Sequence, residues 1–189
     1  NLMCWAGLDR AHRMHKAGFL PSLTLDIDAA RARAAQALLN ATKDGSLRNG
    51  PKDDTYDASL AQAAILGFPN RDVCESTMQS IARALAVQTG GKETGFYFRY
   101  LRTDDFGRPQ SSFVICSFWV VQGLARLGRM AEAQQIMAQV LTGANHLGLF
   151  SEHFVPETRT QLGNFPQAYS HVGLINAAFA VSPSWTTVL

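Results

Sequence analysis

The sequence predicts an all-α chain, and three observations support this prediction. Seven segments have the pattern of helices, and the second of them is rich in Ala, Leu and Arg, which are good helix formers. Gly, Pro and clusters of polar residues separate these segments. The connections between the segments alternate between short and long. The predicted helices cover about residues 2–17, 26–42, 57–66, 70–87, 112–127, 130–142 and 166–180.

The first two helices have recognisable ends. Four apolar side chains lie near one face of the first helix, which ends at Gly18. These side chains are Leu2, Trp5, Leu8 and Met14. Residues 21–24 form a break, after which Asp26 or Asp28 can cap the second helix.

The third and fourth helices are separated by a short break. The third ends before Gly67, and the fourth begins near Asn70 or Asp72 and continues to Val87. Residues 96–101 then read Phe-Tyr-Phe-Arg-Tyr-Leu, and we expect them to be extended because aromatic residues favour strands.

The last three helices differ in how they meet the rest of the chain. The fifth, residues 112–127, is apolar on nearly all sides and should therefore be buried on nearly all sides. The sixth follows after Gly128. The irregular stretch 145–164 comes next, and the seventh helix begins at Pro166, which suits a first-turn position.

Long loops follow the second, fourth and sixth helices. This pattern predicts helical hairpins packed side by side, with the long loops gathered on one rim. An α-solenoid of tetratricopeptide type and a toroid of paired helices both fit. The chain shows no fixed period of about 34 residues and no repeated consensus, which weighs against the solenoid.

The composition is that of one ordinary globular domain. The chain has 189 residues, 47% of them hydrophobic and 17% charged, with a net charge of +2. The scattered Lys and Arg residues predict neither a nucleic-acid-binding stripe nor a membrane-binding cluster, and no apolar run approaches a membrane span.

The cysteine and histidine residues do not predict a metal site. Cys4, Cys74 and Cys116 are odd in number and far apart, so we expect reduced, buried thiols, which lean toward a cytoplasmic location. His12 and His15 are three residues apart on a predicted helix, but no carboxylate or thiol partner is evident.

Three residues on or beside the long loops are candidates for chemistry. Glu152 lies among aromatic residues, which disfavour a charge that does nothing useful; an exposed loop residue is the simpler interpretation. Arg99 has aromatic neighbours that could stack on a sugar, or it is one polar position of a half-exposed strand. Tyr169 opens the seventh helix, where it could face a ligand or only support the helix start.

Several strings resemble glycoside hydrolase family 15, the glucoamylase family, and particularly its bacterial members, which include glucodextranases and some trehalases. The likeness spans most of the chain and is weakest over residues 26–50. The matching strings are Cys-Ser-Phe-Trp-Val-Val at 116–121, Leu-Ala-Arg-Leu-Gly-Arg at 124–129, Ala-Asn-His-Leu-Gly-Leu-Phe-Ser-Glu at 144–152 and Gln-Leu-Gly-Asn-Phe-Pro-Gln-Ala-Tyr-Ser-His at 161–171, with shorter matches at 1–5, 8–10 and 56–60.

The resemblance implies an (α/α)6 toroid, of which this chain supplies about seven helices at the C-terminal end. Residues 1–189 would then be one partial domain, the C-terminal part of a glucoamylase-like catalytic domain. The family's general base falls on Glu152, its glucose-binding arginine on Arg99 and an aromatic residue near that sugar on Tyr169. Phe113 matches a further aromatic position. No metal or organic cofactor is implied.

The implied activity is inverting, exo-acting hydrolysis of α-linked gluco-oligosaccharides or trehalose. The general acid belongs upstream of Asn1, so the missing N-terminal half of the domain would be a partner of this chain. The chain alone should then be inactive and self-associate through helix faces that the other half would cover. Two alternatives are a non-enzymatic helical interaction module and a catalytically lapsed carbohydrate-binding relative.

Overall fold

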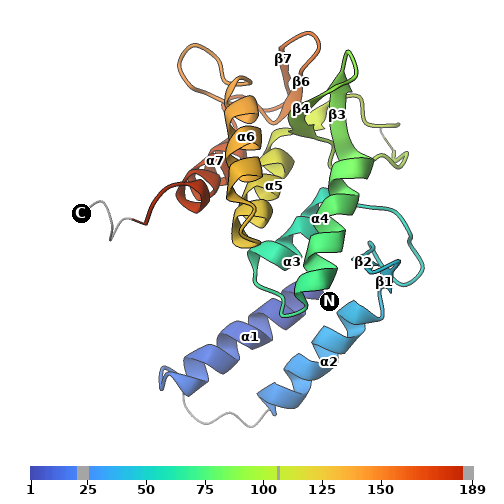
Figure 1. Ribbon diagram of the computed structural model, residues 1–189, viewed down its shortest axis with the longest axis vertical. Helices are drawn as coiled ribbons and strands as arrows, with labels where there is room; N and C mark the ends of the chain where they lie inside the picture. Colours follow the sequence, from blue (N-terminus) through green and yellow to red (C-terminus); the bar gives the residue numbers. More distant parts are fainter. Residues whose placement is uncertain (21–25, 106, 185–189) are drawn as a thin grey trace.

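The chain folds mainly into α-helices, as the sequence predicts. The computed structural model describes residues 1–20, 26–105 and 107–184, so the predicted break at 21–24 lies outside the described residues. Seven α-helices occur in the described part of the chain (Figure 1). They are α1 (Leu2–Lys16), α2 (Ile27–Leu39), α3 (Gln62–Ile65), α4 (Arg71–Leu85), α5 (Val114–Arg126), α6 (Met130–Leu141) and α7 (Ala168–Val181), and the 3-10 helix η1 (Ala58–Ala61) precedes α3.

Short antiparallel strands lie in the long connections between helices. The sequence predicted these strands only in part. β1 (Thr42–Lys43) pairs with β2 (Ser46–Leu47), and β3 (Ala86–Thr89) pairs with β4 (Lys92–Tyr97). β6 (His153–Val155) lies between β5 (Ser112–Phe113) and β7 (Thr160–Leu162). The expected extended segment 96–101 overlaps β4 at Phe96 and Tyr97 only, and the stretch 145–164, expected to be irregular, contains β6 and β7.

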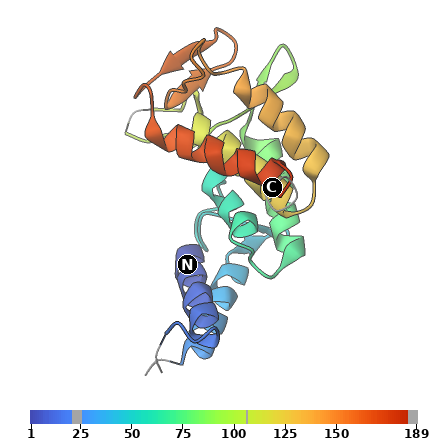
Figure 2. The ribbon, with the colours of Figure 1, turned by 90° about the vertical axis from the view of Figure 1, so that its left-hand side faces the viewer.

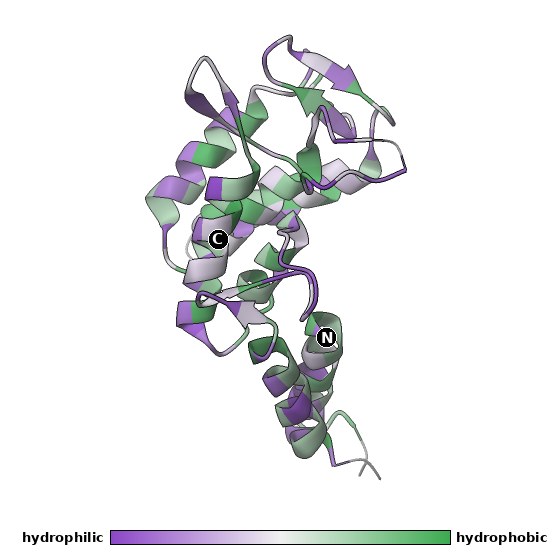
Figure 3. Ribbon diagram, turned by 90° about the vertical axis from the view of Figure 1, so that its right-hand side faces the viewer, coloured by the Kyte–Doolittle hydropathy of each residue, from purple (hydrophilic) through white to green (hydrophobic). Residues whose placement is uncertain are grey.

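Helix α5 forms the centre of the core. It packs against α6 and α7, and residues 114–121 are all buried, which confirms the prediction from its apolar composition (Figures 1 and 2). Gly173 of α7 lets this helix approach closely, because a Cβ there would be 3.1 Å from both Ile115 and Phe118. Figure 3 shows hydrophobic residues gathered where the helices meet, and hydrophilic residues are frequent in the loops.

Helices α1 and α2 form a hairpin at the end of the molecule opposite strands β3, β4, β6 and β7 (Figure 1). Trp5 docks this hairpin by packing edge-on against Phe68, with ring centroids 5.1 Å apart. Arg10 adds a polar contact, since its Nη1 donates to the carbonyl of Leu66 over 3.2 Å.

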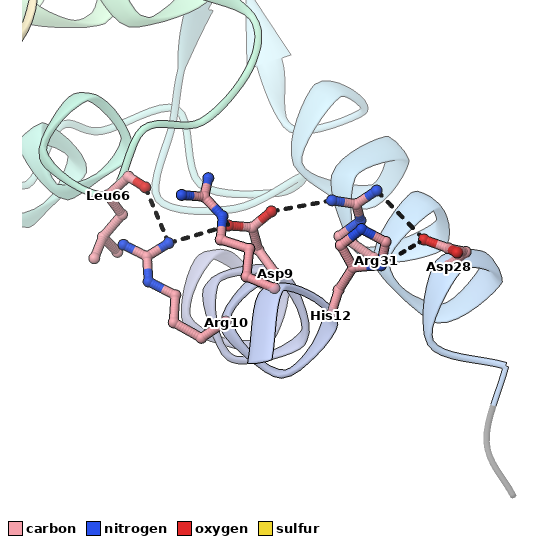
Figure 4. A network of polar contacts seen from close by, with 7 residues as sticks. Asp9, Arg10, His12, Asp28, Arg31 and Leu66 are labelled. Carbon is pink, nitrogen blue, oxygen red and sulfur yellow. Dashed lines mark hydrogen bonds and ion pairs between the residues drawn. The ribbon is translucent and has the colours of Figure 1, made fainter. Parts of the chain in front are cut away.

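A buried carboxylate holds the hairpin together (Figure 4). Asp9 of α1 is only 4% exposed and is surrounded by three guanidinium groups. Arg13 approaches one carboxylate oxygen to 2.8 Å and Arg31 of α2 approaches the other to 3.1 Å. Arg31 also contacts Asp28, which accepts from His12. His12 therefore takes part in a polar network.

The structure corrects one expectation about the cysteines. All three are free, and Cys74 and Cys116 are buried as predicted, but Cys4 on α1 is exposed. No helix in the described ranges is long and apolar enough to cross a membrane.

Candidate active site

A cleft of about 450 Å³ opens among the long loops and brings together three of the four residues that the sequence singled out. Glu152, Arg99 and Phe113 line it. Tyr169 does not, although it lies nearby. Among the described residues, the lining consists of Arg99, Tyr100, Asp104, Gly107, Arg108, Pro109, Gln110, Ser111, Phe113, Glu152 and His153.

The backbone of Glu152 is fixed on both sides. Its carbonyl accepts from the N–H of Val114, the first residue of α5, over 3.0 Å. Its own N–H donates to the carbonyl of Asn164 over 2.9 Å. The N–H of Asn164 in turn donates to Oε2 of Glu152 over 3.2 Å. The half-buried carboxylate is therefore held in place by one hydrogen bond from a fixed donor.

Arg99 follows β4 and forms an ion pair that joins two distant segments. Its Nε donates to Oδ1 of Asp57 over 2.6 Å, and its carbonyl accepts from the N–H of Ala58 over 2.8 Å. Asp57 is 5% exposed, whereas the Arg99 side chain is 38% exposed toward the cleft. The pair thus places a cation at the cleft wall and its counter-ion beneath it.

The surroundings keep Arg99 charged. Burial disfavours the guanidinium cation, but the hydrogen bond and the negative charge of Asp57 outweigh that effect, so the pKa of Arg99 lies above its ordinary value. A permanently charged guanidinium offers hydrogen-bond donors in fixed directions, which suits recognition of the hydroxyl groups of a sugar.

Phe113 and His153 form a flat apolar wall beside Glu152. They are cross-strand partners in the pairing of β5 with β6, and their rings stack at 5.0 Å with an interplanar angle of 20°. Nδ1 of His153 is 3.1 Å from the carbonyl of Ser112 and 3.3 Å from Oγ of Ser111, so these contacts fix the ring. The face of an aromatic ring can pack against the apolar face of a sugar ring.

Tyr169 reaches the cleft only through another aromatic residue. It is in the first turn of α7, is 50% exposed, and meets Trp119 edge-on with ring centroids 6.3 Å apart. The same Trp119 ring lies 5.8 Å from Cζ of Arg99. Tyr169, Trp119 and Arg99 therefore form a continuous row that links the cleft wall to α7.

His171 has a structural role. Its Nδ1 lies 2.8 Å from the carbonyl of Gln167, and its Nε2 faces the N–H of Phe150 at 3.4 Å. Donation from Nδ1 and acceptance at Nε2 satisfy both ring nitrogen atoms. The histidine thereby ties α7 to the chain that leads into Glu152.

Sequence reasoning missed Asp57 and Trp119 as residues that support the cleft. Asp57 precedes a helical turn and looks like an ordinary N-cap, which it also is, since Oδ1 accepts from the N–H of Ser59 over 2.8 Å. Trp119 is in the apolar run of α5 and looks like a core residue. Its contact with Arg99 depends on how α5 packs, which local sequence does not reveal.

Comparison with known proteins shows which proteins this chain is similar to. A family model described as "Glycosyl hydrolases family 15" matches residues 127–179, a segment that contains both Glu152 and Tyr169. Among solved structures, one titled "Glycosidase Wild Type" superposes with a TM-score of 0.65 and 20% identity, covering 82% of this chain and 44% of that one. The chain therefore has the same α-helical fold as part of a glycosidase.

Curated relatives extend the match over nearly the whole chain. A trehalase of Mycolicibacterium smegmatis is 33% identical over 95% of this chain, and a trehalase of Thermoplasma volcanium is 37% identical over 65% of it. The chain spans 27% and 19% of the length of these two proteins. The predicted resemblance is therefore confirmed: this chain is a relative of glycoside hydrolase family 15.

Proposed function

We propose that this chain supplies the general-base side of the active site in an inverting glycoside hydrolase that acts on α-linked glucosides. The observation that supports this most directly is the convergence of Glu152 and Arg99 on one cleft. The carboxylate would activate water, and the guanidinium would bind the sugar whose C1 is attacked. The interaction-module alternative does not require these two side chains to meet.

The reaction needs two carboxyl groups on opposite sides of the glycosidic bond. In an inverting enzyme they lie roughly 6.5–9.5 Å apart, which leaves room for a water molecule. Glu152 would take a proton from this water while the water oxygen bonds to C1. A protonated carboxyl group would give its proton to the leaving oxygen as the bond from C1 breaks. We place that acid in a part of the enzyme outside these 189 residues.

Trehalose is the substrate that we put first, because the relatives with the matches given above are named trehalases. Arg99 would hold hydroxyl groups of one glucose unit, with Phe113 and Tyr169 packing beside the sugar. Oligosaccharides with α-1,4 or α-1,6 bonds are the other candidates to test.

The stereochemistry of the product tests the inverting mechanism. Attack of water with inversion at one C1 of trehalose releases one β-glucose, and the leaving unit keeps its α configuration. Early NMR spectra of the full-length enzyme with trehalose should therefore show equal amounts of the two anomers. A spectrum with α-glucose alone would contradict inversion.

Replacement of the proposed base tests the role of Glu152. Glu152→Gln in the full-length enzyme should lower kcat by roughly 10²–10⁴-fold while substrate binding changes little. Glu157→Gln, an exposed glutamate between β6 and β7, is the matched control and should keep its activity. Turnover near the wild-type level in Glu152→Gln would refute the assignment.

We also propose that the 189-residue chain alone is inactive and self-associates. One face of α7 exposes apolar side chains, among them Val172 and Ile175, each about half exposed. Exposed apolar surface of this kind favours association. Light scattering of the purified chain should show species larger than a monomer, whereas a monomer that releases glucose would contradict this proposal.

A further inference from the structure

We propose that Asp57 is a positioning residue for sugar binding, acting through Arg99. This inference rests on the proposed role of Arg99 at the cleft. Asp57 does not line the cleft itself, and 42 residues separate it from Arg99 in the sequence. Any effect that it has on the substrate must therefore pass through the guanidinium group.

The geometry couples the position of Arg99 to that of Asp57 at two points. Oδ1 of Asp57 accepts from Nε of Arg99 at 2.6 Å, and the N–H of the next residue, Ala58, donates to the Arg99 carbonyl at 2.8 Å. One contact holds the side chain and the other holds the backbone. Both contacts come from residues at the beginning of η1, so this short helix determines the position of Arg99.

The ion pair is formed through Nε of Arg99. It therefore leaves the two terminal nitrogen atoms of the guanidinium group for a ligand. A bond to Nε fixes the plane of the group, and the two terminal nitrogen atoms carry four further donors that this contact does not use. Trp119 lies 5.8 Å from Cζ and limits movement on one side. A guanidinium group that is already oriented loses less conformational entropy when it binds hydroxyl groups.

The burial of Asp57 makes the coupling strong. The Asp57 side chain is 7% exposed, so its charge depends on partners inside the protein. Its hydrogen-bond partners in the described part of the chain are the Arg99 cation and, at 2.8 Å, the N–H of Ser59. Both donate to Oδ1, so loss of the negative charge would weaken the attraction that holds Nε, while the cap on Ser59 could remain.

The test is a double-mutant cycle in the full-length enzyme with trehalose and maltose. Asp57→Asn keeps an oxygen that can cap Ser59 but removes the charge. We expect kcat/KM to fall about 10- to 100-fold, mostly through a higher KM. In an Arg99→Ala background the same substitution should change kcat/KM by less than about twofold, because the group it positions is gone.

Two further variants separate positioning from folding. Asp57→Ser retains a good N-cap residue without the anion and should reproduce the rise in KM. Asp9→Asn is the matched control, because Asp9 is 4% exposed and bound by arginines but lies in the hairpin of α1 and α2, outside the cleft. It should lower the melting temperature and leave KM unchanged.

The outcomes distinguish this inference from the proposed function. Equal losses from Asp57→Asn with and without Arg99, or no loss in the wild-type background, would overturn the positioning role. If Glu152→Gln is inactive at the same time, the proposed function stands without the positioning role of Asp57. If Glu152→Gln is fully active, the proposed function itself fails, whatever Asp57 does.

Discussion

Gly163 lies directly against the carboxylate of Glu152. A Cβ at Gly163 would be 2.6 Å from Oε2 of Glu152, which is closer than real Cβ atoms come, and 3.0 Å from the Cβ of Glu152, which is tighter than most real contacts. The glycine also has φ of +76°, a conformation that side chains rarely adopt. The residue next to it, Asn164, supplies the N–H that binds Oε2. The turn after β7 thus donates a hydrogen bond to the carboxylate of Glu152, the proposed base, and also leaves space for that carboxylate.

Gly163→Ala should therefore impair catalysis more than stability alone explains. The methyl group would displace the Glu152 carboxylate, and we expect kcat to fall at least about tenfold, because a misplacement of about 1 Å is costly for a catalytic group. Gly148→Ala is the matched control, since Gly148 has φ of +77° and open space around its Cβ position. Both variants should lose about 1 kcal/mol of stability. Equal kcat values in the two would contradict the steric argument.

Asp9→Asn should destabilise the hairpin of α1 and α2. The substitution leaves Arg10, Arg13 and Arg31 around a neutral group where a buried carboxylate now accepts from them. We expect a loss of about 1–3 kcal/mol in the free energy of unfolding, measured by urea denaturation. Asp28→Asn removes an exposed partner of Arg31 and should cost less than about 1 kcal/mol. A larger loss for Asp28→Asn would show that burial of Asp9 is not what matters.

The three thiols should differ in reactivity. Burial raises the pKa of Cys74 to about 11, and it also raises the pKa of Cys116 well above the usual range. Because the thiolate is the reactive form, both should resist alkylation in the folded protein at pH 8, while the exposed Cys4 reacts. Peptide mapping by mass spectrometry after brief iodoacetamide treatment checks this. Labelling of Cys116 as fast as Cys4 would contradict the buried packing of α5.

The raised pKa of Cys74 also gives the direction of a pH effect. A group whose pKa is higher in the folded state than in the unfolded state stabilises the protein at pH values below its unfolded-state pKa. This contribution is lost as the pH rises through the folded-state pKa. For Cys74 the window runs from 9.0 to about 11. Buried Tyr97, whose pKa is also raised, acts in the same direction.

Local sequence was sufficient to predict the helices but not every strand. Apolar spacing and caps such as Asn70, whose side chain accepts from the N–H of Val73, predicted α4 closely. The fourth helix ends at Leu85 and not at Val87, because Ala86 already pairs with Tyr97 in β4. That pairing is a tertiary contact, and helix propensity carries no information about it.

The site was predictable where a single residue type stood out. Glu152 and Arg99 attracted attention as charges among aromatic residues, and they line one cleft. Their supports, Asp57 and Trp119, have ordinary local explanations as a helix cap and a core residue. Their further roles arise from contacts across 42 residues of sequence for Asp57 and from the burial of α5 for Trp119.

The cleft exists only in the folded chain, since Arg99, Phe113 and Glu152, which line it, come from three separate segments, and Asp57, which holds Arg99, comes from a fourth. An unfolded chain has no comparable arrangement and should bind sugar negligibly. Ligand binding and folding are therefore thermodynamically linked, and a ligand at 100 times its Kd would stabilise the native state by about 2.7 kcal/mol. A protein built in this way becomes more resistant to heat and proteolysis whenever its ligand is abundant.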